Sequence, residues 1–184
     1  MRRAFSAGPL LTTVSALAIT ATAGGAALAC NPSIVINGSG TMGGITNSGN
    51  IECLVVGDGA VVDGDITNKG TVGAASSPAE TGILVRNATI SGAIVNTGVI
   101  NARGAAIKVT GNSTVTGGIQ NGSEGTIEAR GEDGNSQGVG VSGAGFSGIT
   151  NSGTIIVNSG KGRAVGIAID GGSPGKDGRP KQEP

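Results

Sequence analysis

Apolar residues along most of the chain alternate with polar or small residues, in short runs separated by Gly, Asn, Asp and Ser. Alternation with a period of two predicts β-strands, because successive side chains of a strand point to opposite faces. The apolar members are nearly all Ile and Val, which pack well on a pleated surface. The pattern therefore predicts an all-β chain.

One motif, G-x-I-x-N-x-G-x-[IV], recurs between residues 43 and 155, and its fourth copy carries a two-residue insertion. The motif asparagines are separated by 21, 28, 25 and 30 residues. They are Asn47, Asn68, Asn96, Asn121 and Asn151. Self-similarity at this period is the signature of a repeat architecture.

Each repeat contains two further apolar elements besides the motif. Alternating pairs stand before the next motif at Leu54/Val56, Ile83/Val85, Ile107/Val109, Val139/Val141 and Ile167/Ile169. A single apolar residue precedes the motif Ile by four positions at Val62, Ile90 and Val115. Three short strands per repeat predict a parallel β-helix, whose coils pair with the coils above and below at about 4.8 Å. We expect about five three-strand coils within residues 30–170.

The five motif asparagines share the alternation of the inward Ile residues, so we expect each of them at a corner between two strands. There, Asn tolerates a left-handed backbone and the following Gly allows the chain to turn. The amide of each Asn would bond to its equivalent one coil away and form a ladder. The alternative is five unrelated turn residues that face water.

Differences in repeat length fall mostly in one part of the repeat, between the end of the motif and the next alternating pair. These segments are Gly73–Gly82, Asn101–Ala106, Glu128–Gly138 and Ile156–Gly166. Stacked coils would gather them on one edge, which in solenoids is often the binding face. The alternative is that loops are simply where insertions do least harm.

The first 29 residues have the three parts of a secretory signal peptide. Arg2 and Arg3 precede an uncharged, mildly apolar stretch that ends in Ala27-Leu28-Ala29, a small-x-small cleavage signal. A membrane anchor, a twin-arginine signal and a lipoprotein signal with Cys30 as the lipidated residue are the alternatives. We expect cleavage before Cys30 and export of the mature chain.

The chain contains two cysteines, Cys30 and Cys53, which in an oxidising compartment most simply form a disulfide. Unpaired thiols, or lipidation of Cys30, are the alternatives. Lys and Arg total 12, Asp and Glu total 12, and His, Trp and Tyr are absent from the 184 residues. This composition excludes His-dependent catalysis and His-ligated metals, and it gives no basis for nucleic-acid binding.

The densest group of acidic residues is Asp58, Asp63 and Asp65, within GDGAVVDGD. Such a group suggests catalysis or calcium binding, but Asp-Gly is also ordinary turn sequence, and we interpret it as a turn. Asp133 begins a stretch like a calcium-binding EF-hand loop, yet Ala144 stands where the loop needs Glu. We therefore predict no catalytic, cofactor-binding or metal-binding residue. Residues 171–184 contain three Pro and no apolar residue, as in a disordered tail or linker.

A secretory signal followed by degenerate repeats with strings such as ITNSGTI resembles the passenger regions of bacterial autotransporters and related β-helical surface adhesins. The resemblance covers residues 33–170 and implies export to the periplasm, with display on, or release from, the outer surface of a Gram-negative cell. Such proteins end in a translocator barrel. The sequence ends in Pro184 without one, so we expect either a separately encoded outer-membrane translocator, a stand-alone β-helix or a truncated gene.

These observations predict a secreted or surface-exposed, non-enzymatic scaffold used in adhesion. Glycans or proteins of a host or neighbouring cell are the expected partners, and the open ends of the stack favour end-to-end self-association. The competing hypotheses are an exported carbohydrate-active β-helix, either a polysaccharide lyase or a glycosidase, and a non-functional gene fragment. A groove lined by two or more carboxylates with a Lys or Arg would favour the enzyme.

Overall fold

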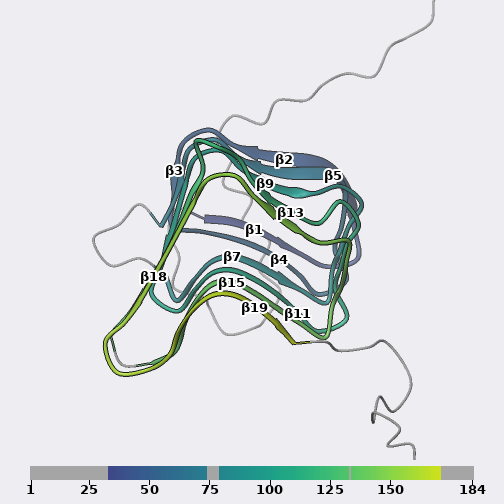
Figure 1. Ribbon diagram of the computed structural model, residues 1–184. Helices are drawn as coiled ribbons and strands as arrows, with labels where there is room; N and C mark the ends of the chain where they lie inside the picture. The colour runs from purple at the N-terminus through teal and green to yellow at the C-terminus, as the bar shows by residue number, and fades with distance from the viewer. Residues whose placement is uncertain (1–32, 74–78, 133, 171–184) are drawn as a thin grey trace, which may run out of the picture.

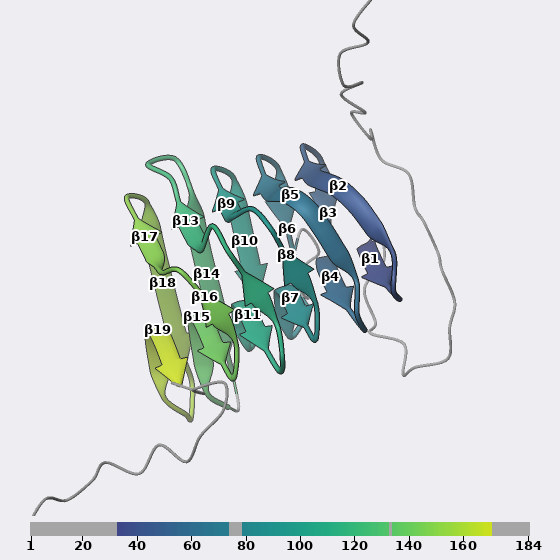
Figure 2. The same cartoon turned by 90° about the vertical axis from the view of Figure 1, so that its right-hand side faces the viewer.

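The structure, a computed structural model, describes residues 33–73, 79–132 and 134–170. This part of the chain forms strands β1 to β19 and no helix. The strands follow one another around a coil, which Figure 1 shows end-on, and successive coils lie side by side in Figure 2. The predicted signal peptide, Cys30 and the predicted tail 171–184 lie outside the described residues.

Each coil contributes to three parallel sheets, which we call faces A, B and C. Face A contains β1 (Ser33–Asn37), β4 (Cys53–Gly57), β7 (Thr81–Arg86), β11 (Ala105–Thr110), β15 (Ser136–Ser142) and β19 (Ala164–Asp170). Face B contains β2 (Thr41–Asn47), β5 (Val61–Asn68), β8 (Thr89–Ile90), β9 (Ile94–Asn96), β12 (Thr114–Val115), β13 (Ile119–Asn121), β16 (Gly145–Phe146) and β17 (Ile149–Asn151). Face C contains β3 (Asn50–Ile51), β6 (Thr71–Val72), β10 (Val99–Ala102), β14 (Thr126–Gly131) and β18 (Thr154–Ser159).

The chain visits the faces in the order A, B, C in every coil. Strands β1 to β3 make the first coil, β15 to β18 make the fifth, and β19 alone begins a sixth on face A. The predicted parallel β-helix of about five three-strand coils is therefore confirmed.

The core consists of columns in which like side chains stack on like. On face A, Leu54 pairs in register with Ile83, and the column continues through Ile107, Val139 and Ile167. All of these except Ile167, in the last strand, are fully buried. Rows of Ile, Val and Ala fill the narrow interior without a large ring at each level, which explains a core almost free of aromatic residues.

Face B changes along the stack. In the first two coils it is one long strand, β2 or β5, with a bulge where Gly64 and Asp65 face Gly44. From the third coil the bulge becomes a break, and β5 pairs with two separate strands, β8 and β9. Gly64 has a φ of 137°, and a Cβ at that position would lie 3.1 Å from the Gly44 nitrogen. A glycine is therefore required where the long strand bends.

Two expectations about strand extent are corrected by the structure. Strand β1, with Ile34 and Ile36 beneath Leu54 and Val56, starts face A before the first pair that the alternation identified. Much of the expected loop sequence is also strand, because β10, β14 and β18 extend past their motif residues. The extension positions Ala102, Ala129 and Val157 continue the inward row, two of them with small alanine side chains.

Candidate functional site

The five motif asparagines form a continuous hydrogen-bonded ladder where face B meets face C. The Nδ2 of each of the first four donates to the Oδ1 of the equivalent Asn in the next coil, and all four distances are 2.8 Å. Asn96, in the middle of the ladder, is fully buried and also donates to the carbonyls of Gly98 and Thr126, both at 3.2 Å. Asn151, in the last coil, is exposed. The ladder therefore satisfies a buried row of amides inside the coil stack.

The expected reason for Asn and Gly at this corner was wrong. None of the ladder asparagines, and none of the glycines two residues after them, has a positive φ; among described non-Gly residues, only Asp58 and Asn87 do, at the corner between faces A and B. The motif glycines are needed for close approach instead. A Cβ on Gly98 would overlap the Gly70 carbonyl oxygen of the coil below, whereas Gly49, in the first coil, has open space.

Cys53 begins β4, is fully buried and is disulfide-bonded. Its predicted partner, Cys30, lies outside the described residues, so the Cys30–Cys53 pairing stays a prediction. A disulfide between these two residues would tie Cys30 to the second coil.

The three aspartates of the acidic stretch serve separate structural contacts. Asp58 has a φ of 55° in a turn and lies 3.7 Å from Arg86 in an exposed ion pair. Asp63 Oδ1 accepts a hydrogen bond from Ser91 Oγ, and Asp65 Oδ1 accepts one from the Ala93 nitrogen. Both of those contacts join the second coil to the third. The interpretation as a turn therefore holds for Asp58 but is wrong for Asp63 and Asp65, which lie in strand β5 and accept hydrogen bonds from the next coil.

The connections from face C to face A differ most in length from coil to coil, and we call this corner the loop edge. Its described residues are 73, 79–80, 103–104, 132, 134–135 and 160–163; residues 74–78 and 133 lie outside the described residues. The loops hydrogen-bond to one another across coils: Gly104 N donates to Glu80 O (2.9 Å), and Gly160 N donates to Gly131 O (2.7 Å). The Arg163 nitrogen likewise donates to Asn135 Oδ1 at 2.9 Å. Stacking therefore gives the loops a defined geometry.

A hollow of about 190 Å³ opens on the loop edge. It is lined by Glu80, Arg103, Glu132, Asn135 and three glycines. Arg103 Nε lies 3.7 Å from Glu80 Oε1, and both side chains are well exposed, 50% and 76%. Two acidic residues and one arginine thus line one hollow, an arrangement suited to hydroxyl-rich or zwitterionic ligands through charge-assisted hydrogen bonds. The length differences between repeats predict variable loops on this edge, with a binding face and tolerated insertions as the two interpretations, but they do not identify these residues.

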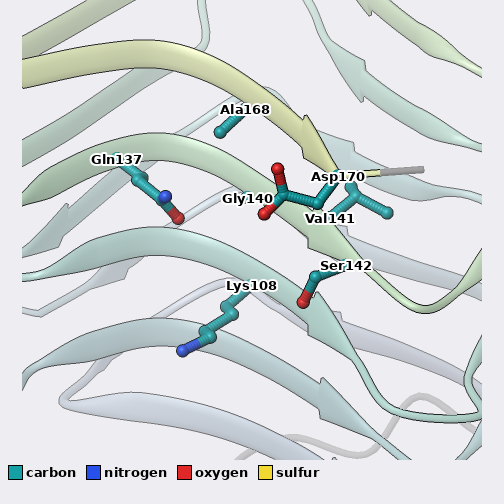
Figure 3. A pocket seen from close by; sticks show the side chains of 7 residues that line it. All are labelled: Lys108, Gln137, Gly140, Val141, Ser142, Ala168 and Asp170. Atoms are coloured by element: carbon teal, nitrogen blue, oxygen red, sulfur yellow. The ribbon is translucent and has the colours of Figure 1, made fainter. Parts of the chain in front are cut away.

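A second, smaller hollow of about 150 Å³ lies on the outside of face A, over β11, β15 and β19. Lys108, Gln137 and Asp170 surround Gly140 there, as Figure 3 shows. The depression exists because Gly140 stands in a row that carries Lys108 on one neighbouring strand and Ala168 on the other. It is a shallow polar surface that involves the last strand of the stack.

Among residues 33–73, 79–132 and 134–170, no group of three His, Cys, Asp or Glu residues is placed to hold a metal ion. The same residues include no helix that is long and apolar enough to span a membrane. Comparisons of the chain with protein-family models, curated proteins and solved structures find no match.

Proposed function

We propose that the protein is a secreted or surface-exposed β-helical scaffold that uses its loop edge to bind glycans or proteins of another cell. The observation that carries the proposal is a contrast within each coil. The inward columns and the Asn ladder repeat with little change, whereas loop length varies at one corner. A constant core with one variable edge is the arrangement by which solenoids present binding loops.

The charge distribution supports the loop edge as the binding surface. Its described residues include both acidic and basic side chains: Glu80, Arg103, Glu132, Lys161 and Arg163. The corner between faces A and B contributes one exposed ion pair, Asp58 with Arg86. Mixed charges on an ordered edge provide many donors and acceptors at fixed spacing, which favours recognition of polar surfaces.

Export is tested by expressing the full chain in a Gram-negative host and measuring the mass of the protein recovered outside the cytoplasm. The signal-peptide proposal expects a mature chain that starts at Cys30. A chain retained in the cytoplasm with residues 1–29 intact would contradict export. A mass increased by acyl chains would indicate the lipoprotein alternative and a membrane-attached scaffold.

Binding is tested with fluorescently labelled mature protein on intact cells and on immobilised glycans. A variant with Arg103→Gln, Glu132→Gln and Arg163→Gln should bind at least about ten-fold more weakly, a loss equivalent to about 1.4 kcal/mol. A control with Asp58→Asn and Arg86→Gln changes the corner between faces A and B and should bind like the parent. Circular dichroism should show both variants folded, because exposed substitutions usually change stability by about 0.5 kcal/mol or less. Equal binding by parent and loop-edge variant would rule out this surface.

One observation favours a second candidate function, a glycan-cleaving enzyme. Glu80 and Glu132 line a single hollow together with Arg103, and paired carboxylates are the usual catalytic groups of glycosidases. We rank this function lower because the Glu80 side chain is 76% exposed and ion-paired with Arg103, whereas ligand sites usually bury most of the bound molecule's surface. Release of new sugar ends from polysaccharides, lost in a Glu80→Gln, Glu132→Gln variant, would reverse this ranking.

A further inference from the structure

The sequence contains the tripeptide Asn-Gly-Ser twice, at residues 37–39 and 121–123, and these hold its two Asn-Gly steps. Such a step is chemically labile, because the nitrogen of the next residue can attack the side-chain amide carbon. Glycine has no side chain to hinder that attack. Since the two copies have the same three residues, the fold is the main source of any difference in their reactivity.

The first copy lies at the corner between faces A and B in the first coil. Asn37 ends β1, and Asn37, Gly38 and Ser39 are all exposed. Gly38 has a φ of 102°, and the Gly40 nitrogen donates to the Gly38 carbonyl at 2.8 Å in a tight turn. A Cβ built on Gly38 would meet no atom within 4 Å. The main chain therefore has room to bring the Gly38 nitrogen toward the Asn37 side chain.

The second copy belongs to the asparagine ladder. Asn121 is 3% exposed, and its Nδ2 donates to Asn151 Oδ1 at 2.8 Å. The same Nδ2 also donates to the carbonyl of Gly125 at 3.2 Å and to that of Thr154 at 3.3 Å. The amide that would leave in the reaction is thus fixed inside the coil stack.

The attacking nitrogen of the second copy is fixed as well. Gly122 N donates to the Asn96 carbonyl at 2.8 Å, and Asn96 Nδ2 donates to Asn121 Oδ1 at the same distance. A Cβ built on Gly122 would lie 3.2 Å from Thr97 Cγ2, so this main chain is also crowded. Attack of Gly122 N on Asn121 Cγ therefore requires that the corner open locally and its hydrogen bonds break.

We propose that Asn37 is a site of spontaneous deamidation, and that the ladder protects Asn121 from the same reaction. The Gly38 nitrogen forms a bond to Asn37 Cγ, the bond from Cγ to Nδ2 breaks, and the proton of the Gly38 nitrogen leaves with Nδ2 as ammonia. Water then opens the resulting succinimide ring at either carbonyl and gives aspartate or isoaspartate. Water is the co-reactant, and no group is oxidised or reduced.

The product adds a negative charge to the outward row Asn37–Gly57–Arg86 of face A. Arg86 in this row already forms an exposed ion pair with Asp58. The isoaspartate form also lengthens the main chain by a methylene group directly before the turn into β2. At Asn121 the same change would replace a buried donor by a carboxylate, which is far more costly. The reaction thus marks aged molecules at a tolerant corner, and this inference does not depend on the proposed binding.

Peptide mass spectrometry of the folded protein, sampled over several weeks at neutral pH and physiological temperature, tests the proposal. The Asn37 amide should convert to acid at least about 100-fold faster than the Asn121 amide, because several hydrogen bonds hold the second site and each is equivalent to roughly a five- to ten-fold factor. In urea, where the ladder is lost, both sites should convert at similar rates. The acidic species that accumulates on ion exchange should be absent from an Asn37→Gln variant.

A ladder variant tests the protection. Asn96→Ala removes the donor to Asn121 Oδ1 and should speed conversion at Asn121 by roughly five- to ten-fold, with Asn37 unchanged. The matched control Asn112→Ala changes an exposed Asn of the same coil as Asn121 and should change neither rate. Absence of conversion at Asn37, equal rates at the two sites in the folded protein, or a 100-fold difference that persists in urea would overturn the proposal.

Discussion

Replacing Asn96 with Ala removes the centre of the asparagine ladder, and its cost can be worked out from the contacts. The side chain is fully buried and takes part in two ladder bonds of 2.8 Å, one from Asn68 Nδ2 and one to Asn121 Oδ1. After the substitution Asn68 Nδ2 keeps its bond to the Val99 carbonyl at 3.1 Å. Asn121 Oδ1 loses its amide donor in a residue that is 3% exposed.

The two lost ladder bonds account for about 1 kcal/mol each, and the buried oxygen left without a donor adds about 1–3 kcal/mol. We therefore expect Asn96→Ala to lower the free energy of unfolding by about 3–5 kcal/mol. Because small domains are stable by only about 5–15 kcal/mol, this change removes a large part of the total.

The control is Asn151→Ala, at the exposed end of the same ladder. It removes one ladder bond, from Asn121, and leaves no buried group without a partner, so we expect a loss of about 1 kcal/mol. Urea unfolding followed by circular dichroism is the suitable assay, because the chain has no Trp or Tyr to report by fluorescence. If the two variants differ by less than about 1 kcal/mol, the ladder does not stabilise the stack as argued.

Three further variants test other parts of the fold by the same assay. Gly98→Ala places a Cβ against the Gly70 carbonyl and should lower the free energy of unfolding by about 1–3 kcal/mol. The control Gly49→Ala has open space at the equivalent position of the first coil, so its free energy of unfolding should stay within about 1 kcal/mol of the parent value. Ile107→Ala should cost about 2–5 kcal/mol because the core closes only partly around the lost methyl groups, against about 0.5 kcal/mol for the outward Ile156→Ala. Cys53→Ser should cost about 3 kcal/mol because the predicted loop to Cys30 is opened. Thiol labelling after unfolding should detect no free cysteine in the parent and one in the variant; an unchanged unfolding midpoint, or two labelled cysteines in the parent, would count against the link.

The repeated part of the fold can be predicted from the sequence because each inward side chain must pack on the equivalent side chain of the coils above and below. A column tolerates few alternatives, so the Ile, Val and Asn positions recur with a visible spacing. Strand β1 is harder to find, because no motif precedes it. The extensions of β10 and β14 are hidden because their inward residues, Ala102 and Ala129, are too small to stand out as apolar.

The proposed binding residues could be located only to a loop edge, not to a set of side chains. Glu80, Arg103 and Glu132 come from three coils, and their proximity depends on how loops of different length stack. No fixed sequence spacing encodes that arrangement. For Ile167 and Ile169 the sequence pattern predicts burial, because it matches that of the buried pairs. They are exposed because they lie in the last strand of the stack.

The parallel order of the coils has a consequence for how the protein forms. Each described strand hydrogen-bonds to strands one coil earlier or later. A folded coil therefore provides the edge on which the next coil pairs, and pairing needs no strand from a distant part of the chain. A chain that emerges gradually from a narrow channel could therefore wind up level by level as it appears. For an exported protein, such stepwise winding at the exit would oppose backward slippage without an external energy source.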